Sequence, residues 1–233
     1  MSRHIIHWYQ PIIQLDAGSI LGYEALLRNV LNIYVSPQNL FKYAKKAGIS
    51  LKLDTYSLQL AMKNANSMLN TLFVNVLPST LLNKNFIRWW DNHINLSAPI
   101  VLELSEIEPV ANWSDLKYTV SELHRRGVKI AIDDMGTGYS SLRHWCDLNP
   151  DFVKLDGYYI NDLTKDNRKQ RVIKSLLNLF ENTADLIAEK IETQDELHVI
   201  RDLGVKYAQG YILGKPAPLQ YIIKNLKGDD FEK

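Results

Sequence analysis

Short apolar runs rich in β-branched residues alternate along the chain with longer amphipathic stretches. The runs that we expect to form strands cover 5–15, 20–26, 72–76, 100–104, 128–132, 152–155, 186–188 and 207–209. Alternation of this kind is typical of α/β proteins. Eight candidate strands, with helices between most of them, favour a modified TIM (β/α)8 barrel over an open doubly wound sheet.

Turn and capping residues set the ends of several elements. A turn at Asp16-Ala17-Gly18 predicts a hairpin between the first two strands, so one strand near the N-terminus is expected to run antiparallel. Ser36 and Pro37 predict the start of a helix that stops at Gly48. Two further helices are predicted over 112–126 and 191–203, each followed by a glycine.

Composition narrows the class of protein. The 233 residues are 46% hydrophobic and carry neither a linker nor a repeat, so we expect a single domain over 1–233. A formal charge of +1 argues against a polynucleotide partner. No apolar run is long enough to span a membrane, and the single cysteine, Cys146, suits a reducing compartment, so the expected location is the cytoplasm.

Polar residues interrupt the ends of the apolar strands. In chain order they are Glu24, Asn75, Glu103, Asp133, Asp134, Lys154, Glu189 and Gln209. The active sites of barrel enzymes are built at the carboxyl ends of the strands, so these side chains are predicted to share one mouth. One such carboxylate alone is usually a solvated charge or a paired ion, but five at one mouth would repel each other unless cations neutralise them.

The ligand types favour a hard cation. Carboxylates with one side-chain amide are typical of magnesium or manganese, whereas zinc ligand spacing is absent from the sequence. Adjacent Asp133 and Asp134 could bridge two cations, an arrangement that serves metal-assisted hydrolysis of phosphoesters. Alternatives are weaker: the sequence has no GxSxG elbow, and Gly136-Thr137-Gly138 lacks the third glycine of a dinucleotide fingerprint.

Several motifs occur in a fixed order between residues 9 and 216: GYEALLR, VNV, ELSE, DDMGTGYSSL, FVKLD, AEKIET and QGYILGKP. This ordered set resembles the EAL-type cyclic di-GMP phosphodiesterases. The resemblance implies a metal-dependent hydrolase that opens cyclic di-GMP, a bacterial second messenger, to the linear dinucleotide. It also implies two divalent cations, magnesium or manganese, and a homodimer formed near the DDMGTGYSSL segment.

The resemblance also implies roles for individual residues. The implied metal ligands are Glu24, Asn75, Glu103, Asp133, Asp134 and Glu189. Lys154, Glu24 and Glu189 match catalytic positions, with Lys154 positioning or polarising the attacking water. Arg28, Gln209 and Asp54 match positions near the substrate. Glu106 and Glu192 match residues that support the loops of the site.

The sequence departs from the family pattern at a few positions beside the implied site. Met135 replaces the usual phenylalanine, Gly157 the usual arginine and Lys190 the usual glycine. Lys190 could pair with a ligand carboxylate and weaken metal binding, but the alternation of side chains along a strand favours an outward orientation. Because the charged set is intact, an active phosphodiesterase is preferred to a silent cyclic di-GMP receptor or a protein-interaction module. Regulation through an unidentified protein stays open.

Overall fold

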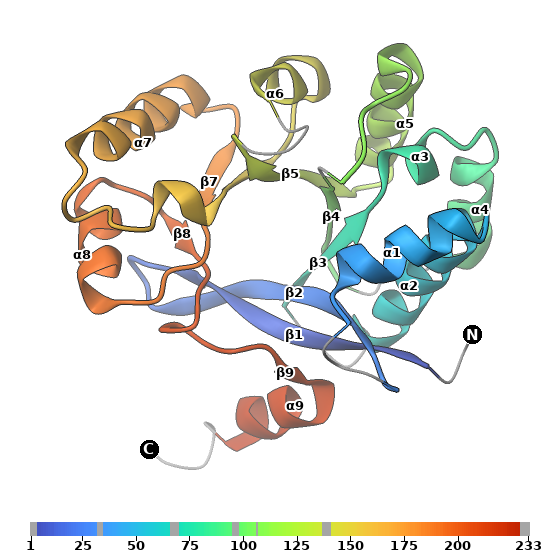
Figure 1. The fold of residues 1–233 in the computed structure, drawn as a ribbon, viewed down its shortest axis with the longest axis horizontal. Helices are drawn as coiled ribbons and strands as arrows, with labels where there is room; N and C mark the ends of the chain where they lie inside the picture. Colours follow the sequence, from blue (N-terminus) through green and yellow to red (C-terminus); the bar gives the residue numbers. More distant parts are fainter. Residues whose placement is uncertain are drawn as a thin grey trace.

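Eight strands close into a barrel around which most of the helices are arranged (Figure 1). The computed structural model describes residues 4–31, 35–65, 70–94, 98–105, 107–136 and 141–228. The barrel strands are β1 (Ile5–Gln14), β2 (Ser19–Asn29), β3 (Thr71–Val76), β4 (Ile100–Leu104), β5 (Lys129–Met135), β6 (Phe152–Leu155), β7 (Asp185–Ala188) and β8 (Tyr207–Ala208). The predicted modified TIM barrel is therefore confirmed.

The barrel departs from a uniform parallel sheet at its first strand. β1 pairs antiparallel with β2 as a hairpin, and it also pairs antiparallel with β8, which closes the ring. The neighbours from β2 to β8 are parallel. The short strand β9 (Ala217–Pro218) pairs antiparallel with Trp8 and Tyr9 of β1. The antiparallel strand predicted near the N-terminus is thus present, and it enters the ring in the opposite sense to the others.

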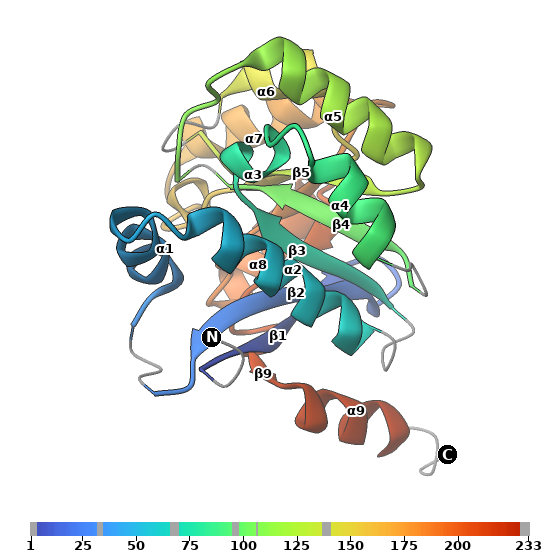
Figure 2. The ribbon, with the colours of Figure 1, turned by 90° about the vertical axis from the view of Figure 1, so that its right-hand side faces the viewer.

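Helices cover the outside of the parallel strands. They are α1 (Pro37–Lys46), α2 (Ser50–Ala65), α3 (Pro78–Leu81), α4 (Phe86–His93), α5 (Trp113–Arg125), α6 (Leu142–Leu148), α7 (Asn167–Phe180) and α8 (Gln194–Asp202), with a 3-10 turn at Gly157–Tyr159. α9 (Leu219–Gly228) lies apart from this ring, against β1 and β9, as Figures 1 and 2 show. Among the described residues, no helix has both the length and the apolar character of a membrane span.

Capping explains where the predicted helices begin and end. The Ser36 side chain accepts a hydrogen bond from the backbone of α1, and Asn112 does the same for α5, as their sequences indicate. The prediction for α8 was wrong at its start, since this helix begins at Gln194 and not at residue 191. Thr193 and Glu196 form a capping box that fixes the later start. Residues 191–193 are thereby left as a loop at the mouth of the barrel.

The inside of the barrel is built in two layers. The lower layer is apolar and takes one residue from β1 and one from each strand between β3 and β7: Ile12, Phe73, Val101, Ala131, Phe152 and Ile187. Two residues further along the same strands stand Asn75, Glu103, Asp133, Lys154 and Glu189. Because side chains two apart on a strand share a face, the polar set lies directly above the apolar layer. The apolar layer therefore forms the floor of a polar site.

Candidate active site

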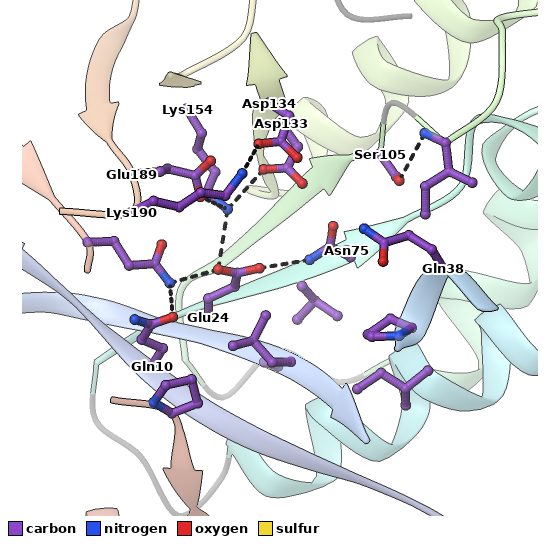
Figure 3. Close-up of a pocket in the computed structure, with 18 of the residues that line it drawn as sticks. Gln10, Glu24, Gln38, Asn75, Ser105, Asp133, Asp134, Lys154, Glu189 and Lys190 are labelled. Atoms are coloured by element: carbon purple, nitrogen blue, oxygen red, sulfur yellow. Dashed lines mark hydrogen bonds and ion pairs between the residues drawn. The ribbon is translucent and has the colours of Figure 1, made fainter. Parts of the chain in front are cut away.

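The polar strand-end residues meet in a cavity at the carboxyl end of the barrel (Figure 3). The cavity has a volume of about 480 Å³, which is in the range of small-molecule sites. Its lining includes Glu24 from β2, Asn75 from β3, Asp133 from β5 and Lys154 from β6. Glu103 from β4 is fully buried beside them. The structure thus brings together side chains that lie more than a hundred residues apart in the sequence.

The ammonium group of Lys154 lies at the point where four carboxylates converge. Its Nζ is 2.9 Å from Glu103 Oε1, 2.9 Å from Glu189 Oε1, 3.0 Å from Asp133 Oδ1 and 3.3 Å from Glu24 Oε2. The lysine side chain is only 1% exposed. We call this group of five residues the inner cluster. One positive charge therefore faces four acids where little water is present to screen them.

Side-chain amides hold the orientation of Glu24. Asn75 Nδ2 donates to Glu24 Oε1 and to Glu103 Oε2, each at 3.0 Å. Gln209 Nε2 donates to Glu24 Oε2 at 2.8 Å and to Gln10 Oε1 at 3.1 Å. Figure 3 shows this chain of contacts running from β1 to β3 through Glu24. Both oxygens of Glu24 are consequently fixed in place.

Burial and repulsion set the protonation of the inner cluster. Burial raises the pKa of Glu103 well above its usual range, and the neighbouring charge of Glu24 adds to this rise. Burial likewise raises the pKa of Glu189. The pKa of Glu24 is lowered, because Lys154 and the amide donors outweigh the effect of burial. The cluster therefore holds more acid groups than one ammonium can keep ionised.

The inner cluster fits divalent cations by its donor chemistry. Its acids and Asn75 offer only oxygen ligands, which are those that magnesium and manganese prefer. Among the described residues no three acid, histidine or cysteine side chains form a ready-made ligand group. Instead, the Lys154 ammonium is already a cation at their centre. The site therefore suits positive charge, and a metal ion on these acids would share them with the Lys154 ammonium.

A second group of charges lies at the rim of the cavity. Lys190 Nζ is 2.5 Å from Asp156 Oδ2 and 3.2 Å from Asp134 Oδ1, and Figure 3 shows it reaching across to Asp134. The predicted outward orientation of Lys190 was therefore wrong. β7 ends at Ala188, and Lys190 has a positive φ of 57°, so the alternation of a strand no longer applies there. We call Asp134, Asp156 and Lys190 the rim group.

The residues predicted near the substrate occupy different depths. Gln209 lies inside the inner network. Arg28 lines the cavity half-buried, where its guanidinium donates to the Leu27 carbonyl oxygen. Asp54, on α2, is almost fully buried in the cavity wall and accepts a hydrogen bond from the backbone of Leu77. Burial raises the pKa of Asp54 to about 6.

Of the two residues predicted to support the loops, only Glu192 belongs to the described part of the chain. Glu192 lies on the cavity rim in the loop before α8, where its backbone N–H donates to Glu196. Glu106 falls outside the described residues. The predictions missed Gln10 and Asp156. Gln10 interrupts an apolar strand like the others, but β1 runs antiparallel, so its residue at the mouth is not at its carboxyl end.

Comparison with known proteins places the chain in a family. The EAL domain model matches residues 1–216. A curated relative is the cyclic di-GMP phosphodiesterase PA2567 of Pseudomonas aeruginosa, which is 31% identical over 89% of this chain and 38% of its own length. The first curated relatives are longer proteins, of which the matched region covers 21%, 46% and 30%.

Solved structures show the same fold. The PaMucR phosphodiesterase in complex with c-di-GMP has a TM-score of 0.83 at 25% identity, over 95% of both chains. A manganese and c-di-GMP complex of BlrP1 from Klebsiella pneumoniae has a TM-score of 0.82 at 24% identity, over 92% of this chain and 56% of that one. The barrel with one antiparallel strand is therefore shared with these proteins.

Proposed function

This chain belongs to the EAL domain family, and from that premise we propose that it hydrolyses cyclic di-GMP to the linear dinucleotide with two divalent cations, magnesium or manganese. The observation that carries the proposal is the inner cluster. Three carboxylates from β2, β4 and β5 and one from the residue after β7 converge on one cation above an apolar floor, beside a cavity of about 480 Å³. Burying four carboxylates carries a large desolvation penalty, so a core with a purely structural role would not contain them.

The names of the relatives and the contents of their structures support cyclic di-GMP as the proposed substrate. The relative from Pseudomonas aeruginosa is named a cyclic di-GMP phosphodiesterase, and the PaMucR and BlrP1 structures contain c-di-GMP. The BlrP1 complex also contains manganese, a metal that the oxygen donors of this chain suit. On this basis we extend the substrate and the cations to this chain.

The residues of the site would divide the work by position. Glu24, Asn75, Glu103, Asp133 and Glu189 would hold one cation, and Asp133 with Asp134 would hold the second. Such cations, when bound, activate water and stabilise the charge that develops on a phosphodiester. The ordered contacts of Glu24 with Asn75 and Gln209 fix one ligand before cations arrive, which lowers the cost of assembling the site.

Lys154 and Arg28 would act on the substrate side. The Lys154 ammonium, which contacts all four acids, would orient the attacking water. Its charge then favours the transition state more than the bound substrate. Arg28, half-buried in the cavity wall, would meet a substrate phosphate through its remaining N–H groups. Asp54 would shape the wall on the same side.

A second candidate function is a cyclic di-GMP receptor without turnover. The specific observation in its favour is the contact of Lys190 with Asp134, because a cation at that position must compete with the ammonium. In a receptor, the cavity and Arg28 would serve binding alone. The carboxylates of the inner cluster would then be relics of a catalytic site that Lys154 neutralises in part.

The test is a product assay with purified protein and cyclic di-GMP. Reactions with magnesium, with manganese and with chelator are resolved for linear dinucleotide, and Glu24→Ala serves as the inactive reference. We expect linear product only with metal and only in the wild type. Measurable binding of cyclic di-GMP without product under any metal would replace the phosphodiesterase with the receptor. Absence of both would overturn both functions.

We also extend the physiological setting from the family. The proposed enzyme would lower a second messenger in the cytoplasm and would form a homodimer near the segment that follows Asp134. Light scattering of the purified protein measures the mass directly, and a monomeric mass at micromolar concentration would remove the dimer from the proposal. A further protein that regulates it would be sought among partners that alter its turnover.

A further inference from the structure

We propose that the Lys190 ammonium competes with a divalent cation for Asp134, so that the site binds one cation tightly and the second weakly. This inference rests on the proposed function, since it concerns the cations of that site. It is carried by three observations: the backbone at Lys190, the space that Gly157 leaves for its side chain, and the pairing of its ammonium.

The backbone of Lys190 is held in an uncommon conformation. Its φ of 57° lies in the left-handed region, which disfavours residues with a side chain. Asp134, its partner across the cavity, also has a positive φ, of 45°. Such conformations cost of order 1 kcal/mol each and persist only where surrounding contacts compensate. The two residues in this conformation are joined by the ion pair between their side chains.

Gly157 makes the path of the lysine side chain possible. A Cβ atom at Gly157 would lie 2.6 Å from Lys190 Cδ and 2.8 Å from Lys190 Cβ, which is closer than real atoms approach. The Lys190 stem therefore fills the space that a side chain at residue 157 would take. Gly157 does not have a positive φ, so its backbone conformation does not require a glycine.

The two neighbouring aspartates pair with different lysines. Asp133 pairs with the buried Lys154, whereas Asp134 pairs with Lys190. Asp156 completes the rim group, and its other oxygen is held by the backbone of Tyr158. A divalent cation that binds between Asp133 and Asp134 would therefore meet a competing ammonium group at each aspartate.

The charge balance predicts unequal affinities. In the inner cluster four acids face one ammonium, so a cation there gains from the excess negative charge. In the rim group the ammonium is already shared by two acids, and its side chain is 56% exposed. A second cation thus meets a partly neutralised ligand and repulsion from Lys190. The tight position is the inner cluster and the weak one includes Asp134.

Equilibrium dialysis with Mn²⁺ tests the inference without using turnover. Wild type is compared with Lys190→Met, which keeps the length of the stem but removes its charge, and with Lys190→Arg, which keeps the charge. Lys206→Met is the matched control, because it removes an exposed lysine paired with Asp185, just before β8, away from the mouth. We expect two classes of Mn²⁺ site in the wild type, the weaker tightened about fivefold in Lys190→Met.

Each variant has a defined outcome. Lys190→Arg and Lys206→Met should bind Mn²⁺ as the wild type does. In an Asp134→Asn background the weak class should be lost, and Lys190→Met should then bring no gain. Three outcomes would each overturn the role of Lys190 and leave the proposed function standing. They are equal Mn²⁺ binding by wild type and Lys190→Met, a single class of site in the wild type, and a gain in affinity that persists without Asp134. No Mn²⁺ binding in any variant would overturn the proposed function as well.

Discussion

The mouth of the barrel contains two lysine-centred groups that differ in depth. In the inner cluster Lys154 is 1% exposed and faces four carboxylates, whereas in the rim group Lys190 is half-exposed and faces two. Both ammonium groups stand beside acids that we assign to cation binding. The two lysines are nevertheless expected to contribute very unequally to the stability of the fold.

The difference follows from solvent screening. Charges removed from water interact strongly, and removing one partner leaves the others uncompensated. Charges near the surface are screened, so an exposed ion pair stabilises by at most about 1 kcal/mol. Lys154 should therefore govern folding and chemistry, whereas Lys190 should adjust metal affinity with little effect on the fold. The predictions below test that division, beginning with the largest effect.

Lys154→Met is expected to destabilise the metal-free protein by about 3 to 5 kcal/mol, because four buried acids lose their counter-charge. The loss should be larger at pH 8 than at pH 6, since protonation of the acids relieves it at the lower pH. Chemical denaturation measures both values. Lys190→Met is the comparison, with an expected loss below about 1 kcal/mol. Equal losses in the two variants would contradict the division by depth.

Asp133→Asn is expected to lower turnover by at least about a hundredfold, or about 2.7 kcal/mol. The metal-free protein should fold as the wild type does or be slightly more stable, because one of the mutually repelling acids is removed. Glu24→Ala should behave alike in the assay. A fall in activity that tracks a fall in melting temperature would point to a structural role instead.

Asp54 is a buried acid without a cation, and it provides a contrast to both groups. Within the described part of the chain no lysine or arginine pairs with it, and burial raises its pKa to about 6 from an ordinary 3.8. The folded protein thus holds this proton more tightly than the unfolded chain. The resulting stability is complete below about pH 4 and is lost as the pH rises through 6.

Asp54→Asn should remove that pH dependence, which in the wild type amounts to on the order of 2 kcal/mol of unfolding free energy between pH 4 and pH 7. The measurement is the free energy of unfolding across this range for wild type and variant. Asn keeps an acceptor for the Leu77 N–H, so the backbone contact can persist. Parallel pH profiles for the two proteins would show that another group is responsible.

The sequence was sufficient to predict that the residues of the inner cluster share the mouth of the barrel. Asn75, Glu103, Asp133, Lys154 and Glu189 each interrupt an apolar strand two residues beyond a buried side chain. A regular strand converts that spacing directly into a shared face. Closure of the barrel then brings the strand ends together, so no knowledge of individual contacts was needed to predict the residues of the mouth.

The rim group could not be predicted by the same logic. Lys190 lies beyond the end of β7, and its side-chain direction depends on a positive φ and on the space left at Gly157. Both are tertiary facts that strand alternation does not encode. Gln10 was missed for another reason, because it lies in the middle of β1, whereas the prediction considered the carboxyl ends of the strands. Regular elements, including the antiparallel sense of the first strand, were therefore predictable, whereas the loop conformation at the rim was not.

Gly157→Ala should produce the smallest effect and test the rim group from its other side. The added Cβ would force the Lys190 stem from its path, since the two would lie under 3 Å apart, at a cost of about 1 kcal/mol in stability. The ammonium would then pair less well with Asp134, and the weaker class of Mn²⁺ site should tighten in the same direction as in Lys190→Met. In a Lys190→Gly background the alanine meets no stem, so both effects should disappear. If Gly157→Ala instead changed Mn²⁺ affinity equally in both backgrounds, the 3-10 turn itself and not the lysine would set the second cation.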